Sequence, residues 1–183
     1  MKKFILITIF SLLIFQSCSQ HNSTEEKNND IYTVVEKLEM EHPSGFFKEA
    51  GKRFTAGEKN DAAFLFYLGE LRYKYYLSAN PNFQPDGEPA VYSSLQSSLG
   101  EEINYSLNDS VDNYISIMDS VISWDKSHDF IFFSKSKFPE KHQEILNGLI
   151  ELRQYVFDNK EDIIKQLKEN KEEEAKYKSK KHE

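Results

Sequence analysis

Apolar residues recur at intervals of three and four along most of the chain after residue 30, and this spacing places them on one face of an α-helix. The helices predicted in this way cover residues 31–41, 44–57, 61–79, 89–100, 109–122 and 139–167. The pattern therefore predicts an all-α fold, an irregular bundle of five to six helices.

The segment from Ala62 to Ala79 differs from the others because it is apolar almost all the way round. A helix of this kind is buried on several sides. Asp61 before it can cap its first turn, and the proline-containing stretch over residues 80–89 after it is predicted to be a long loop. This segment is expected to be the central and most buried helix.

Several segments leave the prediction open. Gly100 is expected to end the helix before it, and residues 101–107 fit either a short helix or an extended piece. The run FIFF at 130–133 fits either a buried loop or a single strand. Residues 157–162 favour an interruption of the last helix. Residues 168–183 have no apolar face, so they fit a solvated helix end or, as we predict, a disordered tail.

The N-terminal residues follow another pattern. Lys2 and Lys3 precede an uncharged apolar run over residues 4–15, and Ser17 and Cys18 follow it. The run is too short to cross a bilayer core of about 30 Å, which takes about 20 apolar residues in a helix. A basic start, a short apolar core and a small residue before the cut are typical of a secretory signal peptide.

The box QSC at residues 16–18 resembles the cleavage box of bacterial lipoproteins, although Phe15 stands where leucine is usual. In that family the cysteine is lipidated on its sulfur and becomes the first residue after cleavage. The resemblance implies that Cys18 carries fatty acid and that residues 1–17 are removed. It also implies a place in the cell envelope, and Ser19 in place of aspartate implies the outer membrane of a Gram-negative cell. The alternative is an ordinary signal peptide with a stray cysteine.

The segment after Cys18 has no apolar residue up to Asp30 and is predicted to be a flexible tether. Twelve coil-like residues span roughly 20 Å. The predicted organisation is a signal peptide, a lipidated cysteine with its tether, one helical domain and a charged tail, over residues 1–17, 18–30, 31–167 and 168–183.

Composition narrows the function. The formal net charge is −7, and the body of the chain has no basic stripe, which disfavours nucleic-acid binding because affinity there depends on cations that neutralise phosphates. If Cys18, the only cysteine, forms the anchor, none remains for a disulfide, a thiolate nucleophile or a cysteine zinc site. No glycine-rich phosphate loop occurs, and no cofactor is expected.

Candidate catalytic and metal residues are few. His128, Asp129 and His142 could serve an envelope hydrolase, but no companion base or oxyanion hole lies at a recognisable spacing. Glu39 and His42 have the spacing of half a di-iron carboxylate site, which needs a second such pair that the sequence lacks. The favoured interpretation is that His128, Asp129 and His142 are polar residues of the surface.

Residues 44–77 resemble a single tetratricopeptide repeat, a pair of interlocking helices. The matching positions are Phe47, Gly51, Phe54, Ala63 and Tyr67. Glu70 and Tyr75 depart from the pattern, and no second copy follows. Because repeats need about three neighbours to bury their faces, one helical hairpin in an irregular domain is the preferred interpretation.

Arg72, Tyr73, Tyr76 and Phe83 are the candidate binding residues, because tyrosine and arginine dominate interface hot spots. Phe83 lies between two prolines in the long loop and is expected to be exposed. The alternative is that the tyrosines fill the core and Arg72 pairs with an internal carboxylate. The leading hypothesis is a non-enzymatic envelope lipoprotein that binds a protein partner, as an assembly factor or an immunity-type protein. The rival is the hydrolase.

Overall fold

A computed structural model describes residues 31–180, and all regular secondary structure in this range is helical. A helix over residues 31–38 precedes α2 (Ser44–Thr55), α3 (Lys59–Ala79), α4 (Glu88–Leu107), α5 (Val111–Ser127), η1 (Ile131–Phe133), η2 (Lys135–Lys137), α6 (Pro139–Asp158) and α7 (Lys160–Lys180). The η elements are short 3-10 helices. The all-α prediction is confirmed, with more helical segments than expected. The FIFF run contains a 3-10 turn and no strand.

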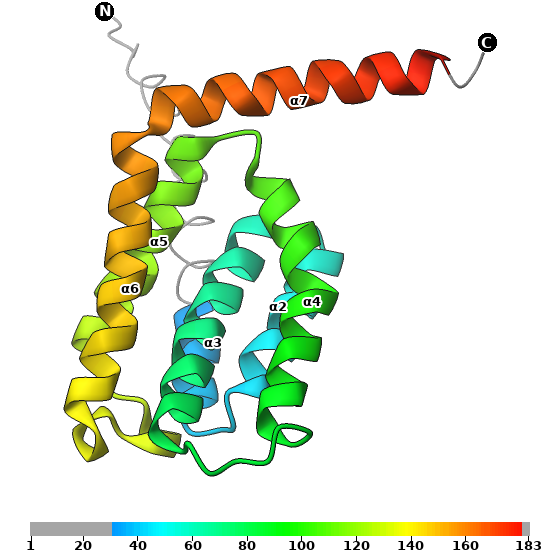
Figure 1. The fold of residues 1–183 in the computed structure, drawn as a ribbon. Helices are drawn as coiled ribbons and strands as arrows, with labels where there is room; N and C mark the ends of the chain where they lie inside the picture. Colours follow the sequence, from blue (N-terminus) through cyan, green and yellow to red (C-terminus); the bar gives the residue numbers. More distant parts are fainter. Residues whose placement is uncertain (1–30, 181–183) are drawn as a thin grey trace, which may run out of the picture.

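Helix α3 lies at the centre of the bundle and packs against α2, α4, α5 and α6 (Figure 1). It begins at Lys59, two residues before the predicted cap, and ends at Ala79 as expected. Most of its side chains are buried, including the aromatic rings of Phe66 and Tyr73. The apolar character on every side of this segment therefore correctly predicted its position.

Helices α2 and α3 form the predicted hairpin and are tightly packed at Gly69. A Cβ atom at Gly69 would lie 2.6 Å from the Cβ atom of Phe46, which no real structure tolerates. At Gly51, the glycine of the repeat-like pattern, a Cβ atom would meet nothing within 4 Å. The helices thus interlock at a different glycine, and the likeness of residues 44–77 to a tetratricopeptide unit stays a prediction.

Helix α4 continues seven residues beyond Gly100, so the expectation that this glycine ends the helix is wrong. Gly100 is buried, and an added Cβ atom would lie 3.0 Å from the Cζ atom of Phe66. Beyond it, Ile103 and Leu107 bury the same helix face. Glycine is present here for close packing, and residues 101–107 are helical because their apolar positions meet the core.

Helix α5 is capped one residue later than predicted. The side chain of Ser110 accepts a hydrogen bond of 3.1 Å from the backbone N–H of Asn113. Asp109 instead accepts a 2.5 Å hydrogen bond from Lys171 of α7. Helix α5 buries Val111 in its first turn and Trp124 in its last.

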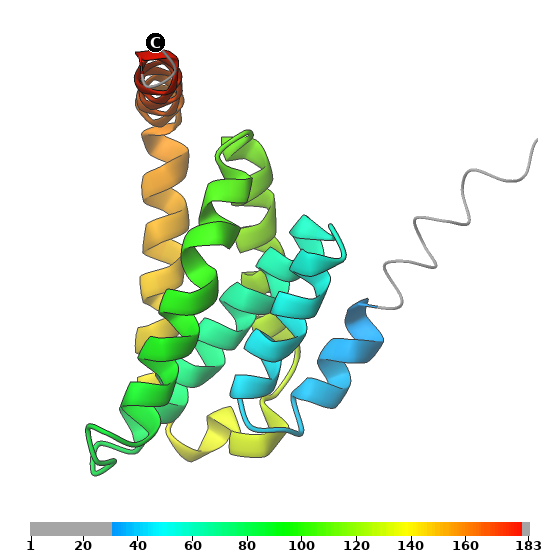
Figure 2. The same ribbon diagram turned by 90° about the vertical axis from the view of Figure 1, so that its right-hand side faces the viewer.

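The last helix is interrupted at Asn159, as the sequence favoured, and α7 runs across the end of the bundle at a steep angle to α6 (Figures 1 and 2). The prediction of disorder after residue 167 is wrong for residues 168–180, which are helical. Their lysines and glutamates favour a helix without a buried face, and Lys171 pairs with Asp109.

The predicted signal peptide, lipidation site and tether, residues 1–30, lie outside the described residues. Within residues 31–180, no helix combines the length and apolar character needed to cross a bilayer.

Candidate functional site

Charged side chains meet in the middle of the bundle, around Arg72 of α3. Its Nε and Nη2 atoms donate to Glu39 at 3.0 Å and 2.6 Å, and Nη1 donates to Asp125 of α5. Glu39 also accepts from the indole N–H of Trp124 at 3.0 Å, and Nε2 of His142 lies 3.0 Å from Asp125. We call these five residues the core network.

The electrostatics of the core network depend on its pairing. Burial alone raises the pKa of Asp125, but the hydrogen bond from His142 and the charges of Arg72 and Lys135 outweigh it, so that pKa lies below its ordinary value. Burial lowers the pKa of the Lys135 ammonium, although the negative charge of Asp125 acts to raise it. Paired and hydrogen-bonded, the buried charges avoid the cost of isolation in a dry interior.

Burial in the structure corrects the prediction for two of the proposed contact residues. Arg72 and Tyr73 are fully buried, so neither can belong to a binding surface. Arg72 instead pairs with internal carboxylates, the alternative that the sequence left open. The hydroxyl of Tyr73 donates to Glu88 at 2.5 Å, and burial, with this hydrogen bond, raises its pKa.

The candidate catalytic residues have other partners. His128 stacks on Trp124 with ring centroids 3.6 Å apart, Asp129 accepts a 2.9 Å hydrogen bond from the backbone of Lys135, and His142 belongs to the core network. Glu39 is bound by Arg72, and no cluster of three or more metal-ligating side chains occurs among residues 31–180. The geometry therefore assigns these groups structural contacts.

Aromatic rings from the last turns of α3 and from the segments that connect the helices meet at the end of the bundle away from α7. We call this cluster the aromatic end, formed by His42, Tyr76, Phe83, Phe132, Phe133 and Phe138. Tyr76 is its hub, with ring centroids 5.3 Å from Phe83 and 5.2 Å from Phe133. Such ring pairs add to the stability that burial alone provides.

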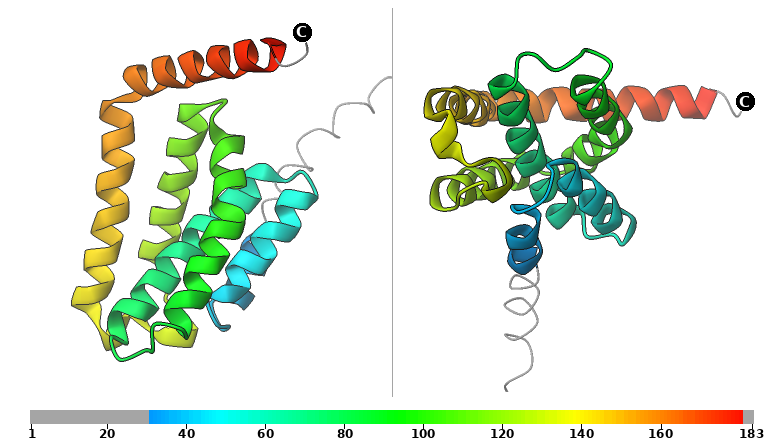
Figure 3. Two further views of the ribbon diagram at one scale, coloured as in Figure 1. Left: turned by 45° about the vertical axis from the view of Figure 1, so that its right-hand side comes forward. Right: turned by 90° about the horizontal axis from the view of Figure 1, so that it is seen from below.

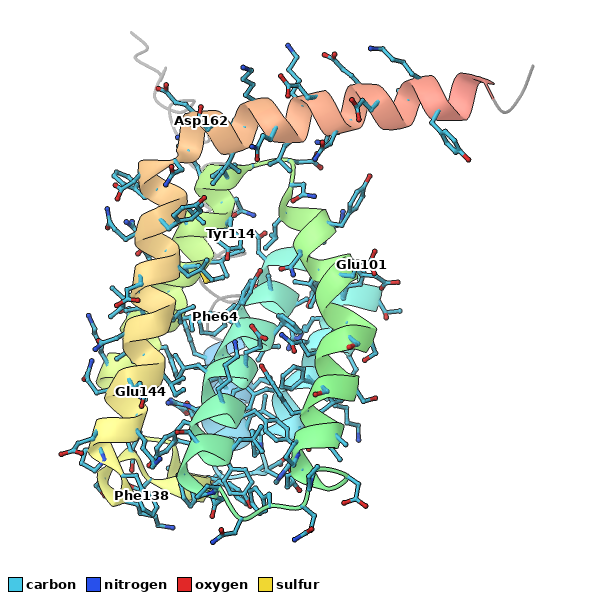
Figure 4. All side chains as sticks on the ribbon, viewed as in Figure 1. Phe64, Glu101, Tyr114, Phe138, Glu144 and Asp162 are labelled. Carbon is cyan, nitrogen blue, oxygen red and sulfur yellow. The ribbon has the colours of Figure 1, made fainter. Side chains whose placement is uncertain are left out.

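The outer part of the aromatic end remains exposed. Ile131, Phe132 and Phe138 are 63%, 37% and 41% exposed, while Tyr76 and Phe83 are half-buried. Phe138 lies at this end in Figure 4, just before α6. Seen from below, the loop between α3 and α4 and the segment before α6 occupy different edges of the end (Figure 3). Apolar side chains are therefore partly exposed at this end of the bundle.

Two hollows line the sides of the bundle. One, of about 520 Å³, runs along α5 beside Tyr32 and a row of serines. The other, of about 400 Å³, lies between α3, α4 and α6, where Glu70 accepts hydrogen bonds from Tyr92 at 3.1 Å and Gln96 at 2.9 Å. Beside the first hollow, the Oγ atom of Ser127 lies 2.9 Å from Nδ1 of His128 and 2.8 Å from the carbonyl oxygen of Ser123. A catalytic triad would further require a group that orients the histidine and an oxyanion hole.

The chain matches no protein-family model, no curated protein and no solved structure. Of the sequence candidates, Tyr76 and Phe83 come together at a partly exposed site. Sequence reasoning missed Ile131, Phe132 and Phe138 as surface residues. One signal could have found them: the segment IFFSKSKF carries apolar residues and lysines without a carboxylate, in an acidic chain.

Proposed function

We propose that the protein is a lipid-anchored, non-enzymatic binding protein of the bacterial cell envelope that holds a protein partner through the aromatic end. The QSC box at residues 16–18 supports the anchor. The observation that carries the binding function is the contrast between two groups of side chains. Arg72, Glu39 and Asp125 are paired with one another in the core. The rings of Phe132 and Phe138, by contrast, are partly exposed at the aromatic end.

The partner contact is assigned to the edge formed by Tyr76 and Phe83. Phe83 lies in the loop between α3 and α4, and its ring packs on Tyr76 at 5.3 Å, so the contact surface is held in place before binding. A preorganised aromatic side chain loses little freedom on association. An assembly factor and an immunity-type protein would both use such a contact.

The anchor is tested by Cys18→Ser. We expect the variant protein to leave the membrane fraction or to keep its signal peptide. The reason is that the fatty-acid chains attached through the Cys18 sulfur would provide the membrane affinity, about 0.8 kcal/mol for each buried CH₂ group. Fractionation and labelling with a radioactive fatty acid read the outcome. Incorporation of label into the Cys18→Ser protein would contradict the lipoprotein proposal.

The contact edge is tested by Phe83→Ala. Loss of a central interface aromatic costs about 2 kcal/mol, or roughly thirtyfold in affinity. The partner is first trapped by a photo-crosslinking amino acid at position 83. Its affinity for the wild-type protein and for the Phe83→Ala variant is then measured. Tyr105→Ala is the matched control, since Tyr105 is an exposed tyrosine of α4 (59%) away from the aromatic end.

The rival hydrolase makes the opposite prediction. Its test is the double variant His128→Gln and Asp129→Asn, chosen because His142 holds the core network and its loss would disturb folding. If the double variant is folded by circular dichroism but loses the cellular phenotype, while Phe83→Ala keeps it, the binding proposal is wrong. Equal loss of affinity in Tyr105→Ala and Phe83→Ala would place the contact elsewhere.

A further inference from the structure

We propose that the outer edge of the aromatic end, formed by Ile131, Phe132, Lys137 and Phe138, rests in the headgroup region of the bilayer that carries the anchor. We call this edge the apolar tip. The inference rests on the proposed lipid anchor and adds a second contact beside the Tyr76–Phe83 edge. The partner protein would then be met at the membrane surface.

The composition of the apolar tip fits a lipid interface. Residues 130–139, FIFFSKSKFP, contain five phenylalanine and isoleucine residues, two lysines and no carboxylate, in a chain of net charge −7. Phe130 is buried and Lys135 binds the backbone carbonyl of Asp125, so the exposed part of this segment includes Ile131, Phe132, Lys137 and Phe138. Aromatic and aliphatic side chains insert at the boundary of headgroups and acyl chains, and lysines beside them bind anionic headgroups. The ammonium of Lys137 lies 4.7 Å from the centroid of the Phe133 ring, so cation and apolar surface are adjacent.

The apolar tip is held firmly in its exposed position. Phe130 is fully buried at its start, the hydroxyl of Tyr75 donates to the carbonyl of Ser134 at 2.9 Å, and Phe133 packs on Tyr75. Asp129, just before the tip, accepts a hydrogen bond from the Lys135 backbone. The apolar residues are therefore presented to solvent by a fixed turn, and their exposure does not come from a frayed loop.

The position of the apolar tip relative to the anchor allows both contacts together. The backbone N–H of Phe132 donates to the carbonyl of Glu39 at 2.7 Å, directly after the helix over residues 31–38. That helix is about 12 Å long at 1.5 Å per residue. A coil of twelve residues, the length predicted for the tether over residues 19–30, spans roughly 20 Å, enough to pass along the helix and bring the tip to the same membrane.

The test uses the single cysteine. In the mature chain the Cys18 sulfur is blocked by its lipid, so a new cysteine is the only free thiol. Ile131→Cys and Phe138→Cys are labelled with an environment-sensitive fluorophore and reconstituted in vesicles of phosphatidylcholine and phosphatidylglycerol. Tyr177→Cys is the control, since Tyr177 is 71% exposed on α7, at the other end of the bundle.

We expect blue-shifted emission at positions 131 and 138, quenched by lipids with a nitroxide near the headgroup, and water-like emission at position 177. Water-like emission at 131 and 138 on an acylated chain overturns the tip contact alone. If these probes become buried only when the crosslinked partner is added, the tip belongs to the protein contact. That result also overturns the membrane contact of the tip. An unacylated chain, read by mass spectrometry of the same sample, overturns the anchor and the tip contact together.

Discussion

Replacement of Arg72 by methionine should destabilise the fold by about 3–5 kcal/mol, the cost of breaking a buried ion pair from one side. Methionine fills most of the space of the arginine, but Glu39 and Asp125, 2% and 0% exposed, would lose their cation. Chemical denaturation, followed by circular dichroism, measures the free energy of unfolding. The midpoint should fall while the slope with denaturant stays the same.

The matched control is Arg153→Met. Arg153 forms a bidentate pair with Asp119 at 2.8 Å, but that pair lies on the surface, where screening by water leaves little net stability. Adding Glu39→Gln and Asp125→Asn to Arg72→Met should recover part of the loss, because the uncompensated charges are then removed. Similar losses from Arg72→Met and Arg153→Met would mean that the core network contributes no more than a surface pair.

Acid sensitivity of the fold should follow from the same carboxylate. The pKa of Asp125 is lower in the folded protein than its ordinary value of 3.8. Its contribution is thus fully present above that value and is lost as the pH falls through the folded pKa. Arg72→Met removes one of the charges that lower this pKa, so the acid transition should move to higher pH.

Replacement of Phe130 by alanine should also cost about 3–5 kcal/mol, the range for removing a fully buried ring. Phe130 is 0% exposed and packs with Tyr75 and Ala79, and the guanidinium of Arg72 lies 5.4 Å from its ring centroid. The cavity would lie directly beside the core network. Thermal or chemical denaturation of the purified domain measures the loss.

Phe138→Ala is the matched control in the same segment, since this ring is 41% exposed and stacks on the ring of Phe133 with centroids 6.0 Å apart. Its removal should change stability far less than the removal of Phe130, yet it should weaken the proposed membrane contact. If Phe138→Ala destabilises the fold as much as Phe130→Ala, the tip is part of the core and its exposure has no separate role.

The sequence by itself determined the helical class and where most of the helices begin. Periodic apolar positions repeat locally, and caps and prolines act within one turn, so these features need no knowledge of distant residues. The apolar surround of residues 62–79 was enough to place α3 at the centre. The expectation that Gly100 ends its helix was wrong, because the role of this glycine depends on Phe66, a residue on another helix.

Only the tertiary structure decided what the polar and aromatic residues do. The sequence left open whether Arg72 is a surface contact or a buried cation, because its partners Glu39 and Asp125 are each more than 30 positions away. Ile131 and Phe130 are adjacent and similarly apolar, yet one is exposed and the other buried. That difference arises from the turn of one short 3-10 segment against α3, a long-range contact that local sequence does not encode.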